Sequence, residues 1–134
     1  MKFLSANYTS GAINAGLLVL RVGLGVLMVP HGYDKIKNFD QYSTQFINFL
    51  GLGSKVSLGL DIFAEFFCGL LVIFGLFTRL ACIPLIIAML VAVFMAHNAE
   101  IFGQGEHAML FAFGFLTLLF TGPGRYSADA MFKG

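Results

Sequence analysis

The sequence predicts an all-α integral membrane protein built as a four-helix bundle, and three observations support this fold class. Hydrophobic residues make up 58% of the 134 residues and charged residues only 11%, which is unusual for a soluble domain. The mean hydropathy is +0.86. Four apolar runs follow one another with short connections, which leaves no room for a second domain. We therefore expect residues 1–134 to form a single membrane domain.

The four apolar runs predict transmembrane helices at about residues 13–30, 56–77, 80–96 and 106–121. A helix needs about 17 to 25 residues to cross the hydrocarbon core of a bilayer. The first three runs are long enough, whereas the fourth suffices only if Glu106 stays near the interface. The first run is expected to be a retained span, because the segment before it carries only Lys2 and no small-residue cleavage pattern follows it.

The connection between the first and second spans has a helical pattern of its own. Apolar and aromatic residues recur at helical spacing, with polar residues between them. This pattern predicts a short amphipathic helix that lies at the membrane interface. Gly51, Gly53 and Ser54 then end that helix. The apolar positions of the pattern are Phe39, Tyr42, Phe46, Phe49 and Leu50.

The basic residues indicate how the bundle is oriented. Those on the side of the N-terminus are Lys2, Arg79, Arg125 and Lys133, and those on the other side are Lys35, Lys37 and Lys55. The connection between the third and fourth spans, residues 98–105, contains neither Lys nor Arg. Because positively charged connections stay in the cytoplasm, this layout predicts that both termini are cytoplasmic.

Arg21 and Glu65 each lie inside an apolar run. A charge at the centre of a bilayer costs about 2.5 to 3.5 kcal/mol on insertion scales unless it is paired or faces a wet cavity. Arg21 is nine residues before Pro30, and Glu65 is nine residues after Val56, so both are expected about 13 Å below the same membrane face. The spacing predicts that they face each other. Such a pair would either fix helix register or form the polar floor of a small cavity, and the sequence leaves both interpretations open.

Further polar residues converge on the same membrane face. Asp61 lies one turn above Glu65, while His31 and Lys35 follow the first span. The candidate ligand-binding residues are Arg21, His31, Lys35, Asp61, Glu65, His97 and Glu106. We expect a cleft that opens toward them rather than toward Arg79. For each histidine taken alone, the alternative is an interfacial residue that bonds lipid headgroups.

Several site types are not expected. Glu106 and His107 are adjacent and diverge by about 100° on a helix, and neither H-E-x-x-H nor C-x-x-C occurs, so no metal site is predicted. Cys68 and Cys82 are expected to differ in depth by about 7 to 9 Å, which favours buried thiols over a disulfide. The formal charge of +1 without a basic cluster argues against nucleic-acid binding.

Short motifs along most of the chain resemble the DoxX family. They are residues 31–36 (HGYDKI), 65–69 (EFFCG), 75–79 (GLFTR), Pro84, His97 and residues 122–129 (GPGRYSAD). The resemblance implies a four-helix prokaryotic membrane protein related to the small membrane subunit of a thiosulfate:quinone oxidoreductase. It marks all the candidate residues except Asp61, together with Arg79, as recurring polar positions and assigns them no roles.

Two functional hypotheses follow. The first is a multi-pass protein of the prokaryotic inner membrane that acts as a subunit of a quinone-linked oxidoreductase system, with a membrane quinone as cofactor and a soluble or membrane redox partner. Quinone carbonyls accept hydrogen bonds from Arg or His in an apolar cleft, and their reduction takes up protons. The alternative is a non-catalytic membrane scaffold or small-molecule carrier, whose buried ion pair is structural. The sequence leaves open catalysis by the chain alone and homo-oligomerisation.

Overall fold

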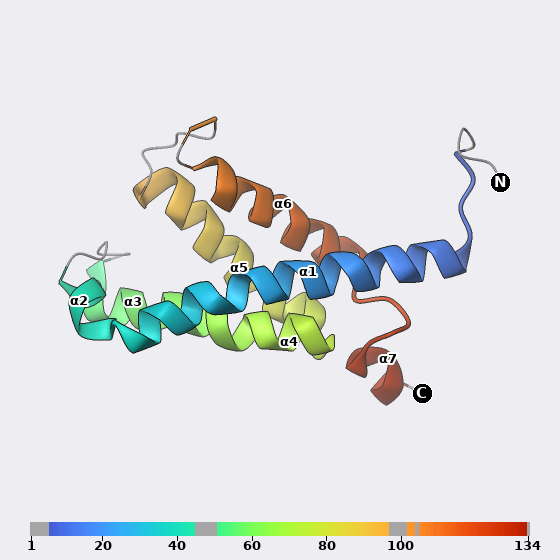
Figure 1. Cartoon of the computed structure of the whole chain (residues 1–134), viewed down its shortest axis with the longest axis horizontal. Coiled ribbons are helices and arrows are strands. Elements are labelled where there is room, and N and C mark those ends of the chain that lie inside the picture. The colour runs from blue at the N-terminus through green and yellow to red at the C-terminus, as the bar shows by residue number, and fades with distance from the viewer. Residues whose placement is uncertain (1–5, 45–50, 97–101, 104, 134) are drawn as a thin grey trace.

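The computed structural model describes residues 6–44, 51–96, 102–103 and 105–133, and within these ranges every regular element is a helix. The first span is α1, Ser10–Lys37, followed by the short helix α2, Phe39–Ser43. The second span consists of α3 (Ser54–Ile62), η2 (Phe63–Cys68) and α4 (Gly69–Phe74). The third consists of α5 (Thr78–Val91) and η3 (Ala92–Ala96). The chain continues through α6, Glu106–Thr121, to α7, Ala128–Lys133 (Figure 1).

The helix lengths confirm the predicted membrane class. Three described helical stretches are long and apolar enough to cross a membrane, namely Ser10–Lys37, Ser54–Phe74 and Thr78–Met95. The fourth, Glu106–Thr121, is apolar but has only 16 residues. The predicted boundary of the first span was wrong, because α1 continues for seven residues beyond Pro30. Proline removes one backbone donor, and membrane helices tolerate that loss where neighbouring groups compensate.

Two helix pairs make up the bundle. The helix α1 packs along α4 and η2, and α5 packs along α6. Glycines allow α1 to approach closely: a Cβ at Gly25 would lie 3.0 Å from the Gly69 carbonyl oxygen, and one at Gly32 would lie 2.7 Å from the Phe66 nitrogen. Small residues permit such contacts between membrane helices. They fix the register of the first pair, with Gly32 level with Phe66.

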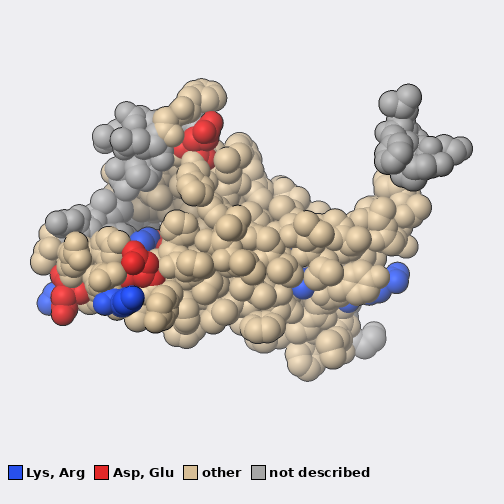
Figure 2. Space-filling view, viewed as in Figure 1, with Lys and Arg blue, Asp and Glu red and all other residues tan. Residues whose placement is uncertain are grey.

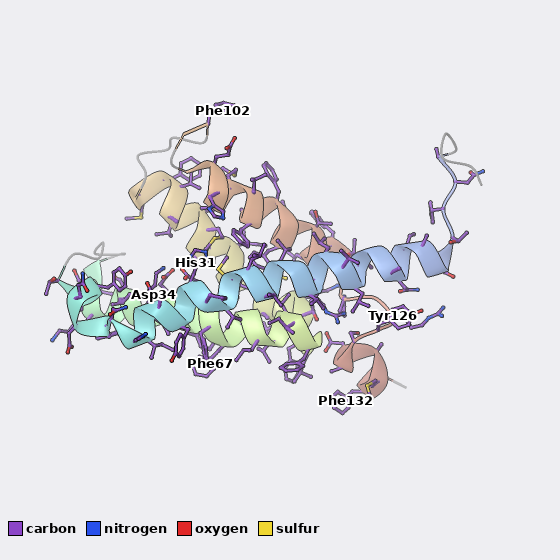
Figure 3. All side chains as sticks on the ribbon, viewed as in Figure 1. His31, Asp34, Phe67, Phe102, Tyr126 and Phe132 are labelled. Atoms are coloured by element: carbon purple, nitrogen blue, oxygen red, sulfur yellow. The ribbon has the colours of Figure 1, made fainter. Side chains whose placement is uncertain are left out.

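The core lies where the two pairs meet. Val72, Leu85, Phe115 and Leu118 are completely buried there, and the free thiols of Cys68 and Cys82 are buried beside them. Large apolar side chains project outward instead, as Phe67 does in Figure 3. In a membrane these outward faces contact lipid, so their exposure carries no penalty.

The C-terminal segment joins the helices at one end. The Asp129 carboxylate accepts hydrogen bonds from the backbone N–H groups of Phe77 and Thr78, at 2.7 and 2.9 Å, and its own N–H donates to the Gly75 carbonyl at 2.8 Å. An acidic side chain at a helix N-terminus satisfies donors that have no partner within the helix. Asp129 therefore caps α5, and the two family-like motifs at 75–79 and 122–129 hold each other in place.

The opposite end of the bundle is more open. The α5–α6 pair meets α1 and α4 near α7 and separates from α1 and α3 toward α2 (Figure 1). The helix α2 begins directly after Asn38, and the Tyr42 hydroxyl donates to Asp34 at 2.6 Å, which raises the pKa of Tyr42. The rest of the predicted interfacial helix, 45–50, lies outside the described residues.

Candidate functional site

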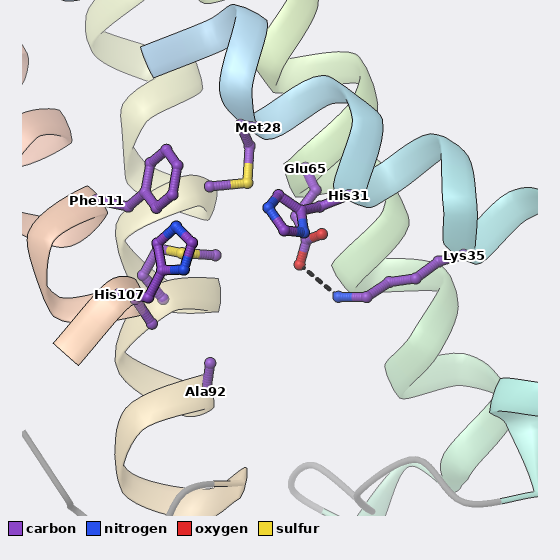
Figure 4. A pocket seen from close by; sticks show the side chains of 9 residues that line it. Met28, His31, Lys35, Glu65, Ala92, His107 and Phe111 are labelled. Carbon is purple, nitrogen blue, oxygen red and sulfur yellow. Dashed lines mark hydrogen bonds and ion pairs between the residues drawn. The ribbon is translucent and has the colours of Figure 1, made fainter. Parts of the chain in front are cut away.

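A cavity of about 170 Å³ lies between the separating helix pairs at the α2 end. Residues of α1, η2, α5, η3 and α6 line it (Figure 4). They are Met28, His31, Lys35, Glu65, Met89, Ala92, His107, Ala108 and Phe111. One part of this wall is charged and the rest is aromatic, aliphatic or thioether.

The charged part is a cluster of one ammonium and two carboxylates. The Lys35 ammonium donates to Glu65 Oε2 at 2.7 Å and also to Asp61 Oδ2. The relative side-chain exposure falls from 23% for Lys35 to 13% for Asp61 and 4% for Glu65. With both carboxylates ionised, this trio carries one net negative charge. Negative charge therefore exceeds positive charge in this cluster, and its side chains are largely shielded from water.

One carboxylate oxygen of this cluster has no hydrogen-bond partner in the described part of the chain. Glu65 Oε1 is buried and accepts no hydrogen bond from any residue in the described ranges. A buried acceptor without a donor costs about 1 to 3 kcal/mol, and more when it is charged. Such atoms are rare in folded proteins and mark places where a ligand or water supplies the missing donor.

Two π-helical segments border the same cavity. Glu65 belongs to η2, and Ala92 on the facing side belongs to η3. A π-segment has an i to i+5 bond pattern, which costs stability and occurs often at functional sites. In η2 it alters the direction in which Glu65 leaves the helix relative to α3. A π-segment has no simple sequence signature, so hydropathy and motif spacing do not predict it.

The aromatic part of the wall is a short stack. The His107 and Phe111 rings are stacked, with centroids 5.4 Å apart and an interplanar angle of 17°. The His31 ring meets His107 edge-on at 6.0 Å. Neither imidazole hydrogen-bonds to any part of the chain that the structure describes, so both can serve a ligand. His107 and Phe111 are four residues apart on one face of α6, which is the spacing that could have identified them.

Arg21 is not part of this site, and the predicted pairing of Arg21 with Glu65 was wrong. The buried guanidinium donates instead to the carbonyls of Ile73, at 3.3 Å, and Pro123, at 3.0 Å. Because α1 extends past Pro30, Glu65 is level with the segment near Gly32, about 16 Å along the helix from Arg21. Lys35 is the partner of Glu65.

The other candidates separate into three groups. His31, Lys35 and Glu65 line the cavity, and Asp61 joins it through Lys35. Glu106 is exposed at the start of α6 and does not line it. His97 lies outside the described residues. Among the described side chains, no group of three His, Cys, Asp or Glu residues is placed to hold a metal ion.

The predicted opening toward His31 is present, but the α7 end is hollowed as well. A depression of about 390 Å³ lies beside Arg79, Pro123 and Asp129. The two ends differ in charge. Most acidic side chains gather near α2 and at the start of α6 (Figure 2). These are Asp34, Asp40, Asp61, Glu65 and Glu106, and Asp129 is the acidic residue described at the α7 end.

Comparison with known proteins agrees with this architecture. The family model described as DoxX matches residues 16–98. The chain belongs to the DoxX family. The match runs from α1 through the third span, so it includes His31, Lys35, Asp61 and Glu65 and excludes the α6 residues of the cavity. The chain is thus a multi-pass bacterial membrane protein.

Two curated relatives match nearly the whole chain. Inner membrane protein YqjF of Escherichia coli is 31% identical over 124 residues, which cover 88% of this chain and 92% of the relative. An uncharacterized membrane protein of Mycobacterium tuberculosis, Rv3486, is 29% identical over 128 residues, covering 84% and 78%. No solved structure matches the chain.

Proposed function

We propose that this DoxX-family protein is the membrane subunit of a quinone-linked oxidoreductase system and that the cavity at the α2 end binds the quinone head group. The observation that carries the proposal is that one cavity combines an apolar, ring-sized volume with the buried Glu65 carboxylate and two imidazoles. Ligand sites in proteins have this character: mostly apolar walls with a few polar groups that fix orientation.

The size of the cavity suits a single six-membered ring. An apolar cavity of about 150 Å³ is enough to bind benzene, and this one measures about 170 Å³. Met28, Met89 and Phe111 offer thioether and aromatic contacts to the flat faces of a ring. A hydrocarbon tail on the same ligand would leave between the separating helix pairs into lipid.

The polar groups suit the oxygens of such a ring. A neutral imidazole carries one N–H donor and one acceptor nitrogen, so His31 and His107 can each bond a ring oxygen. Lys35, Asp61 and Glu65 offer a charged cluster that can exchange protons beside it. Proton exchange has to accompany interconversion of a quinone and a quinol, so both sets of groups serve one chemistry.

The electrons would come from a redox partner, in keeping with the resemblance to the membrane subunit of thiosulfate:quinone oxidoreductases. We also propose that both termini are cytoplasmic, because Arg79 and Arg125 lie at the α7 end, whereas the connection 98–105 contains neither Lys nor Arg. The printed name of the E. coli relative supports an inner-membrane location. In this orientation the cavity lies near the outer face.

Purification from native membranes tests the proposal. The protein in mild detergent should retain a quinone that organic extraction releases and mass spectrometry identifies. Ala92→Phe, which fills the cavity from η3, should lose it, whereas Leu110→Phe, at an exposed position of α6, should keep it. Wild-type protein that neither retains nor rebinds a quinone would favour the scaffold hypothesis.

A further inference from the structure

The cavity presents more hydrogen-bond acceptors than donors in its charged wall. Two of the three N–H donors of Lys35 go to Asp61 and Glu65. Both of these carboxylates, when ionised, accept only. The polar atoms that this cluster presents to the cavity are therefore carboxylate oxygens, and of the two carboxylates it is Glu65 that lines the cavity.

Glu65 Oε1 is the atom for which a ligand has to supply a hydrogen-bond donor. Its carboxylate is anchored through Oε2 on Lys35 at 2.7 Å, so the group is held in place. Oε1 remains buried and without a partner in the described part of the chain. The Glu65 carboxylate and the His31 ring both line the cavity (Figure 4).

We infer that Glu65 Oε1 accepts a hydrogen bond from a ring hydroxyl, so that the site recognises the hydroxyl-bearing form of an aromatic ring, the quinol, in preference to the carbonyl form. This inference rests on the proposed function, since it takes a ring ligand in the cavity as given. A quinol oxygen can donate to Oε1, whereas a quinone oxygen is an acceptor only and would leave two acceptors facing each other.

The imidazoles do not decide between the two forms. Because a neutral imidazole is both donor and acceptor, His31 and His107 can bond a carbonyl or a hydroxyl equally well. The aliphatic and aromatic walls contact the ring faces and are the same for both. Selectivity for the hydroxyl form is therefore assigned to Glu65, which in its ionised form only accepts hydrogen bonds.

A matched pair of single-ring probes tests the inference without a redox reaction. Para-methoxyphenol and para-dimethoxybenzene differ by one hydroxyl hydrogen replaced by a methyl group. Sites that hydrogen-bond a ligand hydroxyl discriminate strongly against analogues that lack it. We expect the phenol to bind wild-type protein at least about tenfold more tightly, as measured by displacement of a short-tailed benzoquinone.

Variants then locate the selectivity. In Glu65→Gln the amide can donate as well as accept, so the preference for the phenol should fall to about twofold or less while the benzoquinone still binds. Glu106→Gln removes an exposed carboxylate outside the cavity and should keep the full preference. If Glu65→Gln does not fold, the wild-type comparison of the two probes still decides.

The outcomes separate the inference from the proposed function. Equal binding of the two probes to wild-type protein that binds the benzoquinone would overturn the inference and leave the proposed function standing. A preference that survives in Glu65→Gln would also overturn it. Failure of wild-type protein to bind the benzoquinone and both probes would overturn the two together.

Discussion

The two ends of the bundle each contain a buried charge and treat it differently. At the α7 end, the Arg21 guanidinium donates to two backbone carbonyls, and the neighbouring Asp129 carboxylate accepts from two backbone N–H groups. At the α2 end, Lys35 is shared between Asp61 and Glu65, and one Glu65 oxygen has no partner among the residues that the structure describes. A charge whose bonds go to the backbone holds the fold, whereas an incompletely bonded charge beside a cavity leaves something for a ligand to complete.

The α7 end also contains a buried polar atom for which the described residues supply no partner, namely Thr78 Oγ1. The Thr78 hydroxyl is neutral, however, and burying an unpaired neutral group costs less free energy than burying an unpaired charged one. Thr78 also takes part in the capped first turn of α5, so its position follows from the fold. The two ends therefore differ in the charge of the unpaired atom and in the cavity that adjoins it.

The largest effect is expected from Lys35→Met. This change leaves two carboxylates side by side without their ammonium, and removal of one partner from a buried ion pair costs about 3 to 5 kcal/mol. The free energy of unfolding, measured by denaturant titration in detergent, should fall toward the lower part of that range because Lys35 retains 23% side-chain exposure. The triple variant with Asp61→Asn and Glu65→Gln should recover most of the loss. No recovery would show that Lys35 stabilises by packing alone.

A smaller loss is expected from Arg21→Met. It removes two charge-assisted hydrogen bonds and leaves the Ile73 and Pro123 carbonyls unpaired, but it also removes a buried charge. We expect a destabilisation of about 2 to 3 kcal/mol by the same denaturant titration. Arg21→Lys should recover little of it, because one ammonium lacks the planar fork that reaches both carbonyls. Full stability in Arg21→Lys would contradict the two-carbonyl role.

The smallest loss is expected from Asp129→Ala. The change removes the cap on α5, and loss of an N-cap side chain costs about 0.5 to 2 kcal/mol. Hydrogen exchange should become faster at the Phe77 and Thr78 amides, while amides at the α2 end keep their protection. Unchanged exchange at these two amides would show that Asp129 does not cap the helix in solution.

The sequence predicted the helices well and their register poorly. Apolar runs are long and contain few charges, so the three longer spans and the marginal fourth could be located directly. Pro30 predicts a helix end and hence the wrong depth for Arg21, because α1 continues to Lys37. That one boundary moved Arg21 about 16 Å from Glu65 and concealed Lys35 as the true partner.

Only some of the polar residues of the cavity could be predicted from the sequence, because the others depend on how the helices pack. Glu65 is conspicuous as a charge inside an apolar run, and His31, Lys35 and Asp61 are conspicuous as polar residues near the ends of such runs. The sequence presents His107 only as a possible metal ligand, because the place of its stack on Phe111 in the cavity wall depends on how α6 faces α1. The π-segments at Glu65 and Ala92 arise from packing between helices and are invisible to hydropathy.

We expect the α2 end to bind a ligand and the α7 end to hold the structure. Titration of detergent-solubilised protein with a short-tailed benzoquinone, in wild type, His107→Ala and Arg21→Met, distinguishes these two roles. His107→Ala should weaken binding by about tenfold through loss of a ring contact and a hydrogen bond, with little loss of stability. Arg21→Met should lower stability yet bind within about twofold of wild type. Equal weakening in both variants, or none in His107→Ala, would contradict this expectation.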